Sequence, residues 1–155
     1  MKPAKQYSDL MSELLKELAD MSNSVDVPVG ALVLDKKLEV MAKSFNSRVQ
    51  KNDPTAHAEI EAIRIAGQKL NNWRLDDCTL IVTLEPCQMC SGAILQSRIS
   101  RVVFGAFEPK TGFLVSKNSQ SENSNIEIIS GVMEEESSKI LSNWFQDKRP
   151  IKDMI

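Results

Sequence analysis

Residues 79–90 read TLIVTLEPCQMC, and this stretch decides the fold. Its first half, residues 79–84, consists of β-branched and aliphatic side chains, which predicts a central strand of a sheet. Pro86 follows this strand, and we expect a helix to begin near Cys87. A strand that leads directly into a helix is typical of α/β folds, in which helices cover the faces of a sheet.

On both sides of this unit, further strands and helices are expected. Apolar residues at helical spacing predict an amphipathic helix before Met21, and polar residues at 46–53 predict a loop. Asp53 and Pro54 predict the start of a second helix that runs towards Leu70. The other expected elements are strands at 28–34, 39–44, 101–105 and 126–129, a turn at 35–37, a loop at 116–125, and a last helix from Glu134 that Pro150 ends. This order predicts a mixed α/β sheet with helices on its faces.

Length and composition limit the class of protein. A chain of 155 residues suits one domain, expected to span residues 1–155. The content of 42% hydrophobic and 26% charged residues is typical of a soluble globular protein. The net charge of -2 provides no overall basic field, so a nucleic-acid partner would have to bind local basic patches. The sequence shows no secretory signal and no membrane-spanning run, which favours the cytoplasm.

Two short motifs carry the chemistry, His57-Ala58-Glu59 and Cys87–Cys90, and each is expected to open a helix. Thiolates are stabilised at helix N-termini, where unpaired N–H groups and the helix dipole favour negative charge. One imidazole and two thiolates form a good zinc ligand set, and three protein ligands leave the fourth position open for water, as catalytic sites require. We therefore predict one zinc ion bound by His57, Cys87 and Cys90.

Glu59 stands two residues after His57 and is expected to lie near the metal without binding it. Zinc lowers the pKa of a water molecule to about 7, and Glu59 would accept its proton and pass protons to the substrate. The combination of H-x-E with P-C-x-x-C is typical of nucleobase deaminases. The sequence thus predicts hydrolytic deamination, with Glu59 as the catalytic acid and base.

Two other interpretations of the cysteines exist. Cys87 and Cys90 could form a redox pair, although such a pair would not need an upstream H-x-E motif. Cys78 could be a fourth ligand that closes a structural zinc site, although a cysteine at a strand edge is more often an inert core residue. The odd number of cysteines, three, argues against a disulfide framework.

Over residues 12–149, the sequence resembles the bacterial tRNA adenosine deaminases of the cytidine deaminase-like superfamily. The segments that carry the resemblance, besides the zinc motifs, are VPVGA at 27–31, DPTAHAEI at 53–60, TLEPC at 83–87, SRI at 97–99, RVVFG at 101–105 and KTG at 110–112. The resemblance implies a three-layer αβα fold with a five-stranded mixed sheet. It also implies a homodimer and the conversion of adenosine to inosine at the wobble position, 34, of a tRNA anticodon.

The resemblance further implies a set of substrate contacts, namely Asn46, Ala58, Leu84, Pro86, Glu108 and Lys110. Asn46 matches the position that hydrogen-bonds the flipped adenine, although the residue alone would favour a plain loop asparagine. Trp144 and Phe145 match an aromatic pair on the last helix, where they could stack on RNA or belong to the core. Three features depart from the family: Glu108 replaces the usual Asp, Pro109 replaces a small residue, and residues 118–125 are unusually polar.

The remaining question is the substrate. Residues 98–117 hold Arg98, Arg101, Lys110 and Lys117 against a single acid, Glu108, and this basic stretch could contact phosphates. Two other functions stay open: a deaminase of free guanine or cytosine, and a non-catalytic subunit that keeps zinc for stability and binds RNA. The presence of Glu59 argues against a non-catalytic subunit, because a site that no longer catalyses the reaction would most simply lose its acid–base group.

Overall fold

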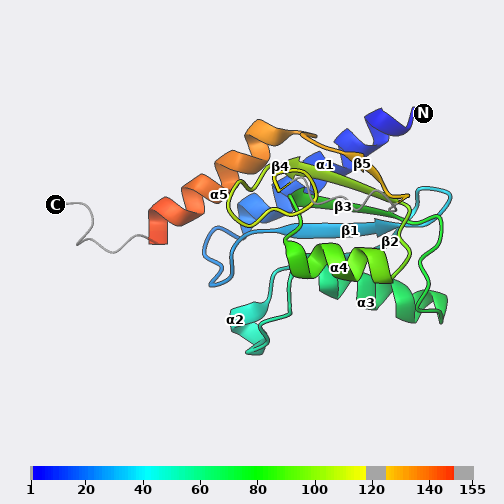
Figure 1. The fold of residues 1–155 in the computed structure, drawn as a ribbon. Coiled ribbons are helices and arrows are strands. Elements are labelled where there is room, and N and C mark those ends of the chain that lie inside the picture. Colours follow the sequence, from blue (N-terminus) through cyan, green and yellow to red (C-terminus); the bar gives the residue numbers. More distant parts are fainter. Residues whose placement is uncertain (1, 118–124, 149–155) are drawn as a thin grey trace.

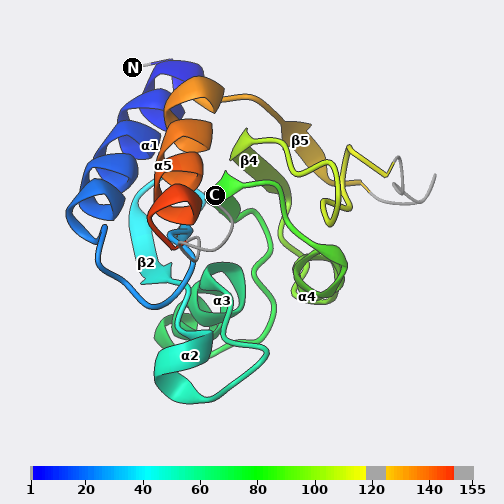
Figure 2. The ribbon, with the colours of Figure 1, turned by 90° about the vertical axis from the view of Figure 1, so that its left-hand side faces the viewer.

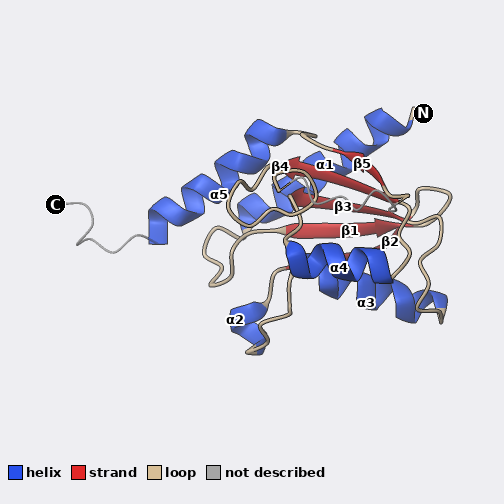
Figure 3. Ribbon diagram, viewed as in Figure 1, coloured by secondary structure: helices blue, strands red, loops and turns tan. Residues whose placement is uncertain are grey.

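The computed structural model describes residues 2–117 and 125–148, in which a five-stranded sheet lies between two layers of helices (Figures 1 and 3). The strands are β1 Gly30–Leu34, β2 Val40–Phe45, β3 Thr79–Leu84, β4 Arg101–Ala106 and β5 Glu127–Ile129. The helices are α1 Pro3–Asp20, α2 Arg48–Lys51, α3 Ala58–Leu70, α4 Gln88–Gln96 and α5 Glu134–Lys148. The predicted three-layer αβα fold is confirmed.

The sheet has the strand order β2-β1-β3-β4-β5 and is mixed. β1 pairs antiparallel with both β2 and β3, whereas β3, β4 and β5 run parallel to one another. β3 is the middle strand, and its first five residues are buried. A strand that is covered on both faces is rich in β-branched and aliphatic residues, as 80–82 are, and the buried Thr83 hydroxyl is satisfied by a hydrogen bond from Gly30 N at 3.2 Å.

The two faces of the sheet are covered by different helices, α1 and α5 on one face and α3 and α4 on the other (Figure 2). Side chains of β3 alternate between these layers, so Ile81 packs with α1 while Leu80 and Val82 pack with α3 and α4. The apolar residues of α3 that are fully buried in this core are alanines, 58, 62 and 66, which lets the helix lie close to the sheet, and Ile63 and Ile65 pack against its edge. Each large aliphatic side chain buried in these layers contributes about 1.5–3 kcal/mol.

Three connecting segments lie beyond one end of the central strands. β3 and β4 are parallel and end together at Leu84 and Ala106, and the antiparallel strand β1 begins beside them, with Ala31 opposite Val82. The segments at this end are 46–57 after β2, 85–87 after β3 and 107–117 after β4. Ligands of open α/β sheets bind outside the carboxyl ends of parallel strands. The fold therefore places the two predicted zinc motifs at the end of the sheet where a site is expected.

Two local predictions were wrong. The helix expected to begin at Asp53 begins at Ala58, because the Asp53 carboxylate accepts hydrogen bonds from the Thr55 N–H and hydroxyl and closes a separate turn. The segment 46–53 is not only loop, since α2 forms inside it. The buried carboxylate of Asp26 accepts hydrogen bonds from Val49 N at 2.8 Å and Gln50 N at 3.3 Å, and these bonds hold the short helix in place. Both differences arise from side-chain hydrogen bonds that sequence periodicity does not reveal.

Among the described residues, no helix is long and apolar enough to cross a membrane. Most of the polar loop predicted at 116–125, and Pro150 at the end of the last helix, lie outside the described residues.

Candidate metal centre and active site

His57 and Cys87 occupy the same position in two helices. His57 is the N-cap residue of α3, with an extended backbone at φ -73° and ψ 152°. Cys87 is the N-cap residue of α4, with an extended backbone at φ -73° and ψ 177°. Within the described residues, neither side chain makes a capping hydrogen bond to its own helix. Cys90 is three residues after Cys87, and side chains at the N-cap and N3 positions lie close together, as in a capping box. The C-x-x-C spacing therefore directs both thiols towards one point beyond the helix end.

The three predicted ligands come together at this point. The Sγ atoms of Cys87 and Cys90 lie 3.6 Å and 3.3 Å from Nδ1 of His57. The three potential ligand atoms all lie within 4.8 Å of one another, and the group could hold a metal ion. Nitrogen and sulfur ligands at about 2.0 and 2.3 Å from a tetrahedral zinc ion would stand about 3.5 Å apart. The donor set and its spacing therefore fit zinc.

The pKa values of the two thiols of this group are shifted in opposite directions. The hydrogen bond from Cys90 lowers the pKa of Cys87 to about 4, and the same bond, with burial, raises the pKa of Cys90. The hydrogen bond to Cys87 also raises the pKa of His57. A divalent cation held by Cys87 and Cys90 would favour the thiolate form of both. The electrostatics of the group thus suit a cation.

Glu59 lies in the first turn of α3 and is only 4% exposed. Burial is the main cause that raises its pKa. Among the described residues, Glu59 is not part of the group that could hold the metal. The structure thus places a buried carboxyl beside His57, separate from the three potential ligands.

Asn46 contacts the start of α3 from the end of β2. Its Oδ1 accepts a hydrogen bond from Ala58 N at 2.9 Å, so the amide oxygen faces the helix and the NH₂ group is turned to other partners. Asn46 also lines a cleft of about 410 Å³ together with Arg48, Pro54 and Trp144. The structure thus brings together two predicted substrate contacts, Asn46 and Ala58, and adds Trp144 to the same cleft.

Comparisons with known proteins agree with this site. Residues 4–106 match the family of the cytidine and deoxycytidylate deaminase zinc-binding region. The chain is also 42% identical to the tRNA-specific adenosine deaminase of Haemophilus influenzae over 95% of its own length and 88% of the relative. The chain belongs to the tRNA-specific adenosine deaminase family. It is therefore a zinc-dependent hydrolytic deaminase.

Two solved structures show how far the similarity extends. A structure from a study of A-to-I editing by tRNA:A34 deaminases is 40% identical to this deaminase, with a TM-score of 0.77, and the match covers 86% of this chain and 99% of that one. The guanine deaminase of Bacillus subtilis is 33% identical, with a TM-score of 0.60, over 69% of this chain and 66% of that one. Both cover most of this chain, and the first covers nearly all of its relative.

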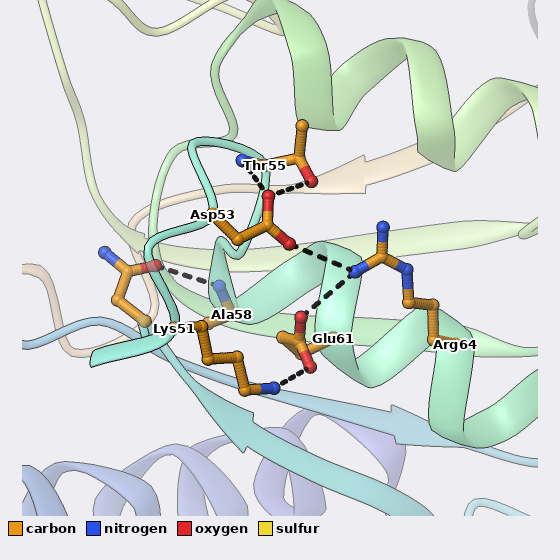
Figure 4. A network of polar contacts seen from close by, with 7 residues as sticks. Lys51, Asp53, Thr55, Ala58, Glu61 and Arg64 are labelled. Atoms are coloured by element: carbon orange, nitrogen blue, oxygen red, sulfur yellow. Dashed lines mark hydrogen bonds and ion pairs between the residues drawn. The ribbon is translucent and has the colours of Figure 1, made fainter. Parts of the chain in front are cut away.

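A polar network braces the loop that leads to His57 in the deaminase (Figure 4). Glu61 pairs with Lys51 at 2.7 Å and with Arg64 at 3.1 Å, and Arg64 also approaches Asp53 at 3.9 Å. These pairs join the loop after α2 to the first turns of α3. Because the basic partners are exposed, each pair contributes less than about 1 kcal/mol. The pairs hold the segment that precedes His57 against α3. They also give Lys51 and Arg64 acidic partners within the protein.

The remaining predicted substrate contacts lie on the other side of the metal group. Leu84 ends β3, and the carbonyl of Pro86 accepts a hydrogen bond from Phe113 N at 2.9 Å. Phe113 belongs to the loop after β4 that also carries Glu108 and Lys110, and the Glu108 carboxylate accepts a hydrogen bond from Lys110 N at 3.0 Å. The structure thus joins Pro86 to this loop, while the contacts of Leu84, Pro86, Glu108 and Lys110 with substrate stay predictions.

The basic stretch predicted at 98–117 does not form one surface. Arg101 begins β4, where it pairs with Glu127 at 2.6 Å and donates a hydrogen bond to the Tyr7 hydroxyl at 2.9 Å. Arg98 precedes it at the same end of the strand, whereas Lys110 and Lys117 follow the opposite end. Six strand residues span about 20 Å, so the two pairs of basic residues lie on different parts of the molecule. Only Lys110 and Lys117 are placed near the metal group.

Cys78 does not join the metal group. It precedes β3, at the opposite end of the strand from Cys87, and it is buried in the apolar core. Within residues 2–117 and 125–148, the group that could hold a metal contains His57, Cys87 and Cys90 and no fourth ligand. The geometry therefore favours an open catalytic site over a closed structural one.

Two buried acids could not be predicted from the sequence: the Asp26 carboxylate accepts hydrogen bonds from backbone N–H groups of α2, and the Glu85 carboxylate accepts them from the loop after β4. Glu85 lies inside the TLEPC motif, but its hydrogen-bond partners are more than twenty residues away. A single sequence gives no signal for such long-range contacts.

Proposed function

We propose that this deaminase converts adenosine to inosine at the wobble position, position 34, of a tRNA anticodon. The observation that carries the proposal is the 42% identity to a tRNA-specific adenosine deaminase, which runs through nearly the whole of both chains. The cleft lined by Asn46 and Trp144 supports it. At about 410 Å³ it falls within the usual size range of small-molecule sites, and it is a cleft rather than an enclosed cavity. An open cleft suits a base that stays attached to a polynucleotide.

We assign His57, Cys87 and Cys90 as the zinc ligands and Glu59 as the residue that moves protons. Zinc, when bound, supplies Lewis-acid activation of water. The Glu59 carboxylate accepts a proton from the attacking water and delivers it to a ring nitrogen of adenine. It then accepts the second proton from the hydroxyl group that has been added to C6 and passes it to the amino group, which leaves as ammonia, so that water and adenosine give inosine and ammonia. The burial of Glu59 beside His57 supports this role.

We assign Asn46 to orientation of the base. Its amide oxygen is engaged by Ala58 N, which leaves the NH₂ group as the donor towards an acceptor nitrogen of a purine. Trp144 lines the same cleft and offers an aromatic surface to a neighbouring base. Leu84, Pro86, Glu108 and Lys110 complete the proposed contacts on the other side of the metal group.

The proposal includes a cytoplasmic location, a single deaminase domain over residues 1–155, and a homodimer. The dimer is supported by α4, on which Met89 and Leu95 are 37% and 38% exposed and offer apolar surface to a second copy. Light scattering at micromolar concentration should give twice the mass of 17.3 kDa, and a monomer mass would reject the dimer.

The second candidate is a deaminase of free guanine, which the 33% identity to the Bacillus subtilis guanine deaminase favours. The deciding experiment offers the zinc-loaded enzyme an anticodon stem-loop with adenosine at the wobble position and, separately, free adenine, guanine and cytosine. We expect inosine in the stem-loop and little or no turnover of the free bases. Faster turnover of a free base would replace the proposal by the second candidate, and no turnover of any substrate would favour a non-catalytic RNA-binding subunit.

A further inference from the structure

We propose that Glu85 is a positioning residue that holds the segment 107–117 against the metal-binding end of α4, so that this segment forms a wall of the substrate site. That Glu85 holds the segment follows from hydrogen bonds alone. That the segment contacts the substrate rests on the proposed function. Glu85 does not itself touch the reacting atoms. It acts through the residues of the segment that it holds.

Glu85 is a buried acid at the junction between β3 and the first cysteine ligand. It is 2% exposed, and its backbone N–H donates to the carbonyl of Ala106 at 2.8 Å, which continues the pairing of β3 with β4. A carboxylate that leaves water needs hydrogen-bond donors to replace it. The residues that donate hydrogen bonds to the Glu85 carboxylate therefore identify the segment that it stabilises.

Among the described residues, the hydrogen-bond donors to the Glu85 carboxylate all belong to the segment 107–117. Oε1 accepts from Glu108 N at 3.1 Å, at the start of the segment. Oε2 accepts from Val115 N and Ser116 N, both at 2.8 Å, near its end, and the Ser116 hydroxyl donates to Oε1. One carboxylate thus ties together two points that lie seven or eight residues apart in the sequence, and the chain between them must form a closed loop.

The middle of the segment packs directly on this carboxylate at Gly112. A Cβ atom at Gly112 would stand 2.5 Å from the Glu85 Cδ and would also collide with the carbonyl oxygen of Glu108. Gly112 also forms an isolated β-bridge with Cys87. Glycine is therefore required here by close approach, and the same approach places the segment against the first cysteine ligand.

The held segment borders a second cleft beside the metal group. Thr111, Phe113 and Lys117 line this cleft of about 540 Å³ together with Cys87 and neighbouring residues of α4. Lys117 directly follows Ser116, the last residue that Glu85 holds. A cation at the rim of this cleft suits the phosphates of a polynucleotide. Glu85 thereby sets where Thr111 and Lys117 meet the RNA that flanks the target base.

The test compares Glu85→Gln with the wild type, both as zinc-loaded full-length protein. Glutamine keeps the size of the side chain but replaces one acceptor oxygen by an NH₂ group, which cannot accept the N–H bonds. We expect the amide hydrogen exchange of Val115 and Ser116 to rise by about tenfold or more, while Ile81 in β3 is unchanged. We expect KM for the wobble-adenosine stem-loop to rise about tenfold with kcat within about twofold, and zinc content to stay constant.

Gly112→Ala provides a second variant that disturbs the same contact from the loop side, and we expect the same pattern of exchange and KM. Gly67→Ala is the matched control, because its added Cβ would meet only the Asn72 carbonyl oxygen at 3.4 Å, an ordinary contact. This control should leave both the exchange of Val115 and the KM unchanged.

The proposal would be overturned if the amide exchange of Val115 and Ser116 stayed unchanged in both Glu85→Gln and Gly112→Ala. Faster exchange with unchanged KM would overturn it as well, because Glu85 would then hold the segment without serving the substrate. The exchange measurement needs no substrate, so it stands even if the wild type fails on the stem-loop. That failure would reject the proposed function, and the KM comparison would then use whichever free base the wild type deaminates.

Discussion

At the scale of single residues, the site depends on where the proposed ligands stand in their helices. His57 and Cys87 are N-cap residues, and Cys90 stands at the third position inside α4. An N-cap residue keeps an extended backbone, so its side chain points beyond the helix end instead of along its surface. Two helices that start at one edge of a sheet can therefore direct three donors to one point.

The first prediction concerns the ligands. Cys90→Ala should remove most of the bound zinc, because two ligands hold the ion much less tightly than three. Metal analysis after dialysis should show about one zinc per chain in the wild type, the number that one three-ligand site allows. Cys78→Ala is the matched control: it should keep the zinc and lower stability by about 1 kcal/mol through lost core packing. Full zinc retention in Cys90→Ala would reject the ligand assignment.

The second prediction concerns proton transfer. Glu59→Gln should keep the zinc and the fold but lower kcat by about two to four orders of magnitude, the usual contribution of an acid–base group. Glu61→Gln, in the same turn of α3 but paired with Lys51 and Arg64, should retain nearly full activity. Steady-state kinetics and metal analysis check both variants. Loss of zinc along with activity in Glu59→Gln would instead make Glu59 a ligand.

At the scale of elements, the turn before α3 decides where that helix begins. Asp53 and Pro54 have the residue types of a helix start, yet the helix begins at Ala58. The Asp53 carboxylate accepts bonds from Thr55 N and Thr55 Oγ1, both at 2.8 Å, and so closes a turn of its own. This turn leaves His57 extended, and an extended His57 can face the two thiols.

The third prediction follows from this turn. The hydrogen bond from the Thr55 hydroxyl is the main cause that holds the pKa of Asp53 below its ordinary value. Such a carboxylate contributes stability above its unfolded-state pKa, and this contribution is lost as the pH falls through the lower folded-state pKa. Thr55→Val should raise the pKa of Asp53 towards its ordinary value. An NMR titration of the Asp53 carboxyl checks this, and equal pKa values in the two proteins would contradict it.

At the scale of the whole molecule, the sheet separates residues that are close in sequence. Arg98 and Arg101 lie before and at the start of β4, while Lys110 and Lys117 follow its end. The length of one strand therefore divides the basic stretch between two ends of the fold. The lysines lie beyond the carboxyl ends of the strands, on the same side as Cys87 and Asn46.

The fourth prediction tests this separation. Lys110→Glu should weaken binding of the anticodon stem-loop and reduce its salt dependence, because fewer counterions are released from the RNA. Lys36→Glu makes the same charge change in the turn between β1 and β2, at the opposite end of the sheet, and should have a much smaller effect. Fluorescence anisotropy across a range of salt concentrations measures both. Equal effects of the two variants would show that binding depends on net charge and not on this surface.

The sequence by itself determined the chemistry and the class of fold. The three proposed ligands, Glu59 and the central strand belong to local patterns: a ligand type, a spacing of two or three residues, and a run of β-branched and aliphatic side chains. Such patterns can be interpreted without knowing which distant residues lie nearby in the fold, because helix starts and buried strands impose their own residue preferences.

Only the tertiary structure decided how the loops are held and which cations lie near the metal group. Asp26, Glu85 and Gly112 act on residues twenty or more positions away, and their hydrogen bonds and close contacts exist only after the sheet has formed. The start of α3 likewise depends on whether the Asp53 carboxylate caps a helix or closes a turn with Thr55. The residue type alone permits both, and the structure shows the turn. Long-range hydrogen bonds carry no periodicity, and the distance between Arg101 and Lys110 depends on the direction of a strand.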